Sequence, residues 1–339
     1  MSLQISPCPA LLSLALLASI RAGGAILRHY DDYEISYKDD NSPLTSADLS
    51  ANEAILSTLS QSEIPICSEE SLLNLDELAI LERFWLIDPL DGTKDFICKT
   101  GEFCVCIALI EHGRPILAVI YAPKFDEMYY SDGRGLFGTN AQSVMREFRL
   151  NLDANSTFLT SNLIQNLDQI SQKDMSNLDS FASANFIEPN LAKFRSNLPP
   201  YSSHQISPKF NQIQKIQPQI SAQNILMHGS HSGISPFKKT LISRFNLRAR
   251  KLGSALKYCK IASGEASLSV GSAKMSLWDA AAGDFLLCQS GGKVIDLLTK
   301  KAPLYDGKDG FKMHPTLAVN QNLISKIDEI CEIYSEFRA

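Results

Sequence analysis

The residues with the clearest chemical meaning lie in one stretch, residues 85–96, which reads Trp-Leu-Ile-Asp-Pro-Leu-Asp-Gly-Thr-Lys-Asp-Phe. Asp88 and Asp91 flank a stiff Pro-Leu pair, and Gly92 and Thr93 follow at once. Carboxylates suit hard divalent cations, which prefer oxygen ligands, and the backbone N–H groups of a Gly-Thr turn can bind an oxyanion. Taken alone, the motif is equally compatible with a polar turn in which proline and glycine serve only the backbone geometry.

Two further segments have the same acidic character and favour a metal site. Residues 66–71 form a short apolar run that ends in Glu69 and Glu70, and Glu70 is expected to be solvated. In residues 278–284, Asp279 opens a small-residue helix, where it could be an N-cap, a metal ligand or both. Carboxylates that converge on one pocket would repel one another unless cations neutralised them, and Mg²⁺ is the natural occupant.

The elements that must position these acids follow from hydrophobic patterning. The apolar run at residues 84–87 predicts a buried strand that carries Asp88 at its end. From residue 224 onward, strand and helix patterns alternate, as in a layered α/β structure. The other expected elements are helices at 7–30, 46–60, 254–263 (capped by Ser254) and 279–289, antiparallel strands at 103–110, 115–121 and 128–131, and strands at 224–228, 266–270 and 293–297.

Composition bounds the class of protein. The chain has 339 residues, of which 45% are hydrophobic and 20% charged, and these values are ordinary for a soluble globular protein with room for two domains. The formal net charge of −5 argues against a nucleic-acid polymer as partner, but not against a small phosphorylated ligand. Eight scattered cysteines without a Cys-x-x-Cys pair favour reduced thiols in a cytoplasmic protein over a zinc site or a disulfide framework.

An apolar stretch at residues 9–18 could pass for the core of an export signal. No positively charged segment precedes it, and Arg21, Arg28 and His29 continue a helical pattern after it. We therefore expect the first core helix here. No segment reaches the roughly 20 apolar residues that a membrane span needs, so no span is expected. The sequence leaves the oligomeric state open.

Composition changes between residues 151 and 223. This stretch is rich in Ser, Asn and Gln and has few aliphatic runs, which predicts a flexible polar insertion. We accordingly expect an N-terminal α+β domain at 1–150 with most of the metal ligands, the insertion at 151–223, and a C-terminal α/β domain at 224–339 that carries Asp279.

The acidic segments together resemble the inositol monophosphatase superfamily of magnesium-dependent, lithium-sensitive phosphatases, over roughly residues 10–150 and 225–320. Two segments are similar to its 3′(2′),5′-bisphosphate nucleotidase branch, whose bacterial form serves sulfur assimilation. They are residues 40–48, Asp-Asn-Ser-Pro-Leu-Thr-Ser-Ala-Asp, and residues 252–259, Leu-Gly-Ser-Ala-Leu-Lys-Tyr-Cys. The resemblance implies a five-layer α-β-α-β-α sandwich and about two or three Mg²⁺ ions.

The resemblance also implies roles for individual residues, which are assigned by their positions in the family motifs. Asp48 and Thr93 would orient an attacking water, and Ser254 and Lys257 would contact a nucleotide substrate. The implied metal ligands are Glu69, Asp88, the backbone carbonyl of Leu90, Asp91 and Asp279. The implied substrate contacts are Glu69, Leu90, Asp91, Gly92, Thr93, Ser230, His231, Ser254, Lys257 and Asp279.

One departure from the branch concerns the second phosphate of the substrate. Gly271 stands where the branch has an arginine, and Lys274 could substitute for it without the bidentate fork. The main interpretation is removal of the 3′-phosphate from 3′-phosphoadenosine 5′-phosphate, which gives AMP. Two alternatives stay open: an inositol-phosphate or sugar-phosphate monoesterase with the same metal chemistry, and a non-catalytic protein that binds a phosphorylated ligand or a partner.

Overall fold

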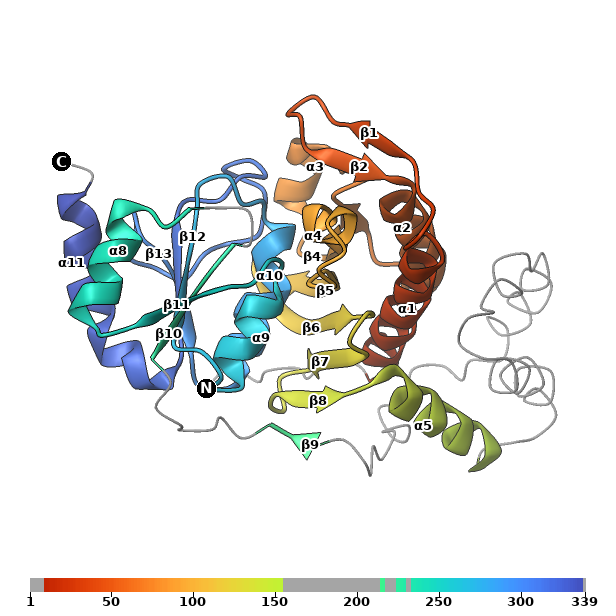
Figure 1. Ribbon diagram of the computed structural model, residues 1–339. Coiled ribbons are helices and arrows are strands. Elements are labelled where there is room, and N and C mark those ends of the chain that lie inside the picture. Colours follow the sequence, from red (N-terminus) through yellow and green to blue (C-terminus); the bar gives the residue numbers. More distant parts are fainter. Residues whose placement is uncertain (1–8, 155–213, 217–223, 230–232, 338–339) are drawn as a thin grey trace. The chain divides into compact units, whose positions relative to one another are not determined.

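The computed structural model describes residues 9–154, 214–216, 224–229 and 233–337 (Figure 1). Two compact units are present: Met1–Ala141 together with Ile213–Ala339, and Gln142–Gln212. The expected insertion at 151–223 lies largely outside the described residues, so the division of the chain at residues 150 and 223 stays a prediction. Every described candidate site residue belongs to the first unit.

A seven-stranded sheet carries the first acidic segments. β3 and β4 run parallel, and each later neighbour pairs antiparallel. The three antiparallel strands expected between residues 103 and 131 are therefore confirmed. In sheet order the strands are β3 (Ile66–Ser68), β4 (Arg83–Asp91), β5 (Cys104–Glu111), β6 (Arg114–Ala122), β7 (Glu127–Ser131), β8 (Phe137–Thr139) and β9 (Gln214–Lys215).

Strand β4 brings two acids into the interior because its apolar residues are buried on both faces of the sheet. Trp85 and Ile87 have no exposed surface. Pairing with β5 is regular as far as Asp88 and then shifts register before Asp91. Pro89, which has no N–H to donate, lies inside this irregularity. The strand therefore does not end at Asp88, as expected from sequence, but continues past the bulge to Asp91.

A second sheet has the order β11-β10-β12-β14-β13. β10 pairs in parallel with both β11 and β12, whereas β14 pairs antiparallel with β12 and β13. The alternation of strand and helix patterns after residue 224 thus corresponds to a mixed sheet. Its strands are β10 (Ile225–His228), β11 (Arg248–Lys251), β12 (Leu268–Gly271), β13 (Lys293–Asp296) and β14 (Thr316–Val319).

Helices and sheets alternate in five layers, which confirms the expected fold class (Figure 1). α1 (Pro9–Arg28) and α2 (Ser46–Leu59) pack together, and α1 covers one face of the first sheet. α9 (Leu256–Ala262) and α10 (Trp278–Gln289) lie between the two sheets in a shared core. α8 (Pro236–Arg244) and α11 (Ile327–Glu336) cover the outer face of the second sheet, where they share a separate core with β10, β12 and β14.

Helix α1 is the expected first helix, and the structure places it in the core. By length and composition Ala10–Arg28 could cross a membrane, but half of that stretch is buried inside the protein. Leu16 and Ile26 have no exposed surface, and the helix packs against α2, β5 and β6. Its apolar residues are therefore accounted for by packing within the first unit.

The remaining elements are short, and one corrects an expectation. Helix α9 begins at Leu256 with Ala255 as its N-cap, so Ser254 is not the N-cap residue, but its hydroxyl accepts a 3.4 Å hydrogen bond from the backbone N–H of Leu256. Ser254 instead has a left-handed backbone with φ of 50°, a conformation outside the extended range of an N-cap serine. The other elements are β1 (Ile35–Tyr37) and β2 (Pro43–Thr45), α3 (Leu75–Ile80), α4 (Thr93–Ile97), α5 (Ala141–Ala154), and the 3₁₀ helices η1 (Ser60–Ser62) and η3 (Gln321–Lys326).

An ion pair between a partly exposed arginine and a buried carboxylate connects the first sheet to α10. Arg114 on β6 lies 3.0 Å from the carboxylate of Asp284 on α10, which has no exposed surface. Tyr305 donates a 3.0 Å hydrogen bond to the same carboxylate. Burial raises the pKa of Asp284, although Arg114 opposes this shift. The carboxylate thus depends on Arg114 for its counter-charge.

We predict that Arg114→Ala lowers the free energy of unfolding by about 3 kcal/mol, because it leaves a buried carboxylate without a cation. The loss should be largest above neutral pH and should shrink as pH falls, because a protonated Asp284 needs no counter-charge. Urea unfolding at two pH values measures both effects. Arg83→Ala, which removes a partly exposed pair with Glu111, is the control and should cost less than about 1 kcal/mol. Equal losses in the two variants would contradict this role for Asp284.

Candidate active site

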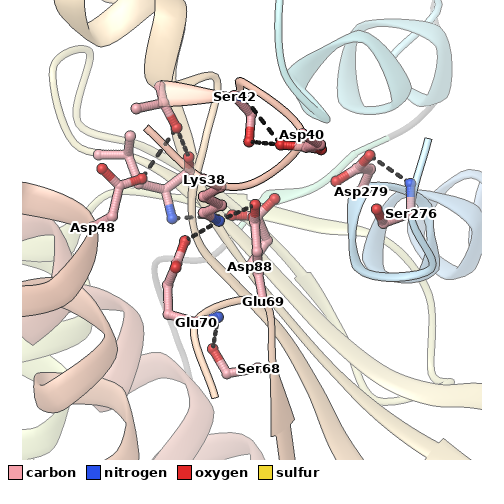
Figure 2. A network of polar contacts seen from close by, with 12 residues as sticks. Lys38, Asp40, Ser42, Asp48, Ser68, Glu69, Glu70, Asp88, Ser276 and Asp279 are labelled. Carbon is pink, nitrogen blue, oxygen red and sulfur yellow. Dashed lines mark hydrogen bonds and ion pairs between the residues drawn. The ribbon is translucent and has the colours of Figure 1, made fainter. Parts of the chain in front are cut away.

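Three carboxylates from distant parts of the chain meet at the edge of the first sheet. Glu69 follows β3, Asp88 lies on β4 and Asp279 lies in the first turn of α10. One oxygen atom from each lies within 4.8 Å of the others. Figure 2 shows Glu69 close to Asp88, with Asp279 on a separate segment. The structure therefore brings together three of the four acids that the sequence nominated.

The electrostatics of this cluster are unfavourable for Asp88 and Asp279. Asp88 is 2% exposed, and burial together with the charges of Glu69, Asp91 and Asp279 raises its pKa well above the usual range. Burial and the charge of Asp91 also raise the pKa of Asp279 to about 7. Asp279 still accepts a 2.8 Å hydrogen bond from the backbone N–H of Ser276. A donor set made only of oxygen atoms in a strongly negative pocket fits Mg²⁺.

The fourth acid, Asp91, lies beside the cluster rather than in it. Its carboxylate accepts a hydrogen bond from the backbone N–H of Ala255, at the start of α9. A carboxylate oxygen of Asp91 also lies within 4.8 Å of the sulfur atoms of Cys104 and Cys106. Burial raises the pKa of Asp91 to about 6, against the opposing effect of the nearby Lys257 charge. Asp91 therefore connects the acidic cluster to the second half of the chain.

Thr93 and Asp48 form the pair that the sequence predicts. The hydroxyl of Thr93 donates to Asp48 Oδ1 at 3.0 Å, and the carbonyl oxygen of Leu90 lies 3.3 Å from the same hydroxyl. Asp48 is also the third residue of α2, where its Oδ2 accepts bonds from the backbone and side chain of Thr45 in a capping box. Burial raises the pKa of Asp48 despite these bonds. The acid thus serves both as a helix cap and as the partner of Thr93.

The turn between Asp91 and Thr93 requires glycine. Gly92 has a φ of 93°, and a Cβ atom there would lie 3.2 Å from the backbone oxygen of Glu102. A side chain at this position would strain the backbone and crowd the neighbouring chain. Gly92 thereby sets the sharp change of direction from β4 into α4.

Lys38 is a site residue that sequence reasoning missed. Its ammonium lies 2.7 Å from Glu69 and 2.7 Å from Glu70 (Figure 2). The expectation that Glu70 is solvated is therefore wrong: its side chain is 6% exposed because it is paired with Lys38. Lys38 lies two residues before Asp40, which begins the segment that resembles the nucleotidases. This position in the sequence could have indicated that Lys38 belongs to the site.

Lys238 is a second lysine that sequence reasoning missed, and its charge is affected by the predicted substrate contact Lys257. Lys257 donates a 3.0 Å hydrogen bond to the carbonyl of Ser254 and is half-buried. Burial and, to a smaller extent, the charge of Lys257 lower the pKa of Lys238 on α8, so the two positive charges act on each other. Binding of an anion by both lysines would offset this repulsion. The predicted contacts Ser230 and His231 lie outside the described residues.

The missing arginine has a steric explanation. Gly271 is the last residue of β12 and is buried, and its φ is not positive. A Cβ atom there would lie 2.4 Å from the sulfur of Met275 and 2.5 Å from Oγ1 of Thr316. Any side chain at Gly271 would therefore force its neighbours to move. Lys274, the suggested substitute, is exposed.

Comparisons with known proteins show the family of the chain. The model of the inositol monophosphatase family matches residues 10–331. A 3′(2′),5′-bisphosphate nucleotidase CysQ from Buchnera aphidicola is 32% identical over 279 residues, which cover 80% of this chain and 79% of that protein. Crystalline CysQ from Bacteroides thetaiotaomicron has a TM-score of 0.65 at 23% identity and covers 94% of this chain and 99% of its own. An IMPase/NADP phosphatase solved with Mg²⁺ and phosphate has a TM-score of 0.59 at 14% identity. It covers 91% of this chain and 89% of its own.

The five-layer fold, the acidic site and the match over residues 10–331 define a phosphatase that acts on phosphoric monoesters. The chain belongs to the inositol monophosphatase family.

We predict that Asp279→Asn raises the free energy of unfolding, by on the order of 1 kcal/mol, in the presence of a chelator above pH 7. The folded-state pKa of about 7 lies above the unfolded value, so the charged carboxylate destabilises the folded protein increasingly as pH rises from about 4 to 7. Thermal unfolding across this range measures the difference between the two proteins, which should vanish at the acidic end.

Asp296→Asn is the matched control with the opposite sign. The burial of Asp296 is outweighed by hydrogen bonds from Thr299, His314 and Leu298, so its pKa is lowered. Asp296→Asn should therefore destabilise the protein at neutral pH. If both asparagine variants lose stability, the acidic cluster does not carry the repulsion described here.

Proposed function

We propose that this chain is a magnesium-dependent 3′(2′),5′-bisphosphate nucleotidase that converts 3′-phosphoadenosine 5′-phosphate to AMP and phosphate. The observation that carries the proposal is the 3.0 Å hydrogen bond from Thr93 to Asp48 beside the three converging carboxylates. A protein that only binds a phosphorylated ligand has no need of such a hydroxyl–carboxylate pair. The 32% identity to a CysQ nucleotidase supports this substrate class. The compartment we propose is the cytoplasm, since the cysteines of the described residues are free thiols.

Glu69, Asp88 and Asp279 would hold the magnesium, with Asp91 and the carbonyl of Leu90 as further ligands. When bound, Mg²⁺ lowers the pKa of a coordinated water and offsets charge on the phosphoryl group. This role explains why the fold keeps carboxylates together although burial raises the pKa of Asp88.

Thr93 would position the attacking water. Its hydroxyl proton points to Asp48, so the lone pairs of its oxygen are left to accept a proton of the water. Asp48 is 2% exposed and its pKa is raised by burial, which suits it to take up a proton through Thr93 as the water attacks. The new phosphorus–oxygen bond forms as the bond to the ribose oxygen breaks, and that oxygen leaves as a hydroxyl after it takes a proton.

The phosphate that is not cleaved would bind between Lys257 and Lys238. The two side chains come from α9 and α8, and the pKa of Lys238 is lowered by burial and, to a smaller extent, by the charge of Lys257. An anion bound by both lysines would offset the repulsion between these charges. Lys257 is also close enough to Asp91 to oppose the rise in the pKa of that acid. This position beside the acidic cluster suits a substrate with two phosphate groups.

Phosphate release by the purified chain tests the proposal. With Mg²⁺, turnover of 3′-phosphoadenosine 5′-phosphate should exceed that of inositol monophosphates and sugar monophosphates. Lithium should inhibit it, and a chelator should abolish it. Preference for a monophosphate would favour the inositol-phosphate or sugar-phosphate alternative. Absence of turnover with every substrate would favour the non-catalytic one.

We predict that Thr93→Val lowers kcat by about 10²-fold or more, because it removes the hydroxyl that orients the water. The isosteric change keeps the volume of the side chain, so KM and the thermal unfolding midpoint should change little. Thr93→Ser, which restores the hydroxyl, should recover most of the activity. A Thr93→Val enzyme with near wild-type kcat would show that the hydroxyl is dispensable.

We also predict that Lys257→Ala and Lys238→Ala each raise KM for 3′-phosphoadenosine 5′-phosphate by about tenfold, through the loss of a charge-assisted contact. The effect on 3′-AMP, which lacks the 5′-phosphate, should be much smaller. Lys239→Ala is the matched control, since Lys239 is adjacent in the sequence but exposed. Equal effects on both substrates would mean that the lysine pair does not bind the second phosphate.

A further inference from the structure

Two thiols lie directly beside the acidic cluster. Cys104 and Cys106 are two positions apart on β5, so they project from the same face of the sheet. Their sulfur atoms are 3.7 Å apart, and both residues are at most 1% exposed. A carboxylate oxygen of Asp91 lies within 4.8 Å of both sulfurs. The three side chains therefore form a compact group with two sulfur donors and one oxygen donor.

The spacing of the two sulfur atoms matches a tetrahedral metal centre. A Zn–S bond of about 2.3 Å and tetrahedral angles place two thiolate sulfurs about 3.8 Å apart. The distance of 3.7 Å in the protein is thus already that of a bound pair. Soft thiolates prefer thiophilic cations such as Zn²⁺ and Cd²⁺, whereas the oxygen-only cluster of Glu69, Asp88 and Asp279 suits Mg²⁺. Asp91 is only partly buried, and one of its carboxylate oxygens lies within 4.8 Å of both sulfurs.

We propose that Cys104, Cys106 and Asp91 form a second, inhibitory metal site that binds a thiophilic divalent cation such as Zn²⁺ or Cd²⁺. Binding forms two metal–sulfur bonds and releases both thiol protons to solvent. The ion holds the carboxylate of Asp91 and so withdraws it from the neighbouring magnesium cluster. Metal binding stands on the thiol geometry alone, and only the inhibition rests on the proposed phosphatase function.

Cadmium binding to the reduced full-length protein tests the site without an activity assay. With excess Mg²⁺ present, addition of Cd²⁺ should produce the ultraviolet charge-transfer band of cadmium thiolate. Cys106→Ala should weaken this band, and the Cys104→Ala/Cys106→Ala variant should abolish it. Two controls should keep it: Cys331→Ala, a buried thiol in the other core, and Cys98→Ser, an exposed one. Thermal unfolding confirms that each variant is folded. A band of wild-type intensity in the double variant, or its loss in Cys331→Ala, would overturn the site.

Inhibition is measured separately with Zn²⁺ in the phosphate-release assay. The Zn²⁺ concentration for half inhibition should rise at least about tenfold in the double variant, because two of three ligands are gone. An unchanged value would place the inhibitory ion at the carboxylate cluster and overturn the inhibitory role. If the wild-type protein releases no phosphate, the proposed function fails, and the cadmium band still decides the metal site.

Discussion

Repulsion among Glu69, Asp88 and Asp279 is the constraint on which the rest of the structure depends. The pKa of Asp88 is raised far above its usual range because this carboxyl is buried among like charges. Such an arrangement persists only where the surrounding fold holds it in place. Here β3 and β4 position Glu69 and Asp88, and α10 positions Asp279, which is far from them in the sequence.

The five-layer architecture holds the three acids in place. The first sheet is buried under α1 on one face and under α10 on the other, so β4 cannot relax away from α10. Asp284, five residues after Asp279 on α10, is bound by Arg114 and Tyr305. These contacts fix α10 against the first sheet at a distance from the acids. Packing and ion pairing remote from the site thus determine the distances within it.

Much of this arrangement could be predicted from the sequence because it is encoded locally. The apolar run before Asp88, the antiparallel strands after residue 103 and the small-residue helix at Asp279 are present near their expected positions, and the fold class is confirmed. Most of the features that sequence reasoning missed depend on contacts between distant residues. Lys38 pairs with Glu70, the charge of Lys257 acts on Lys238, and Thr316 lies beside Gly271. Hydrophobic periodicity does not predict such contacts.

Asp91 lies between the acidic cluster, the start of α9 and the two thiols. Its backbone ends β4, its carboxylate accepts a hydrogen bond from the backbone N–H of Ala255, the N-cap of α9, and two thiol sulfurs lie within 4.8 Å of a carboxylate oxygen. A residue placed between an oxygen-rich cluster and a sulfur pair can serve hard and soft cations in turn. The register shift in β4 gives it this position, since an unbroken strand would hold Asp91 in the regular ladder.

The central claim is that the acidic cluster holds magnesium. Calorimetric titration of Mg²⁺ into chelator-treated protein, wild type and Asp88→Asn, tests it most directly. Asp88 is the most buried of the three acids, and the charges of Glu69, Asp91 and Asp279 all raise its pKa. The account predicts saturable binding to the wild type and at least about tenfold weaker binding to Asp88→Asn. Equal affinity in the two proteins, or no binding to the wild type, would contradict it.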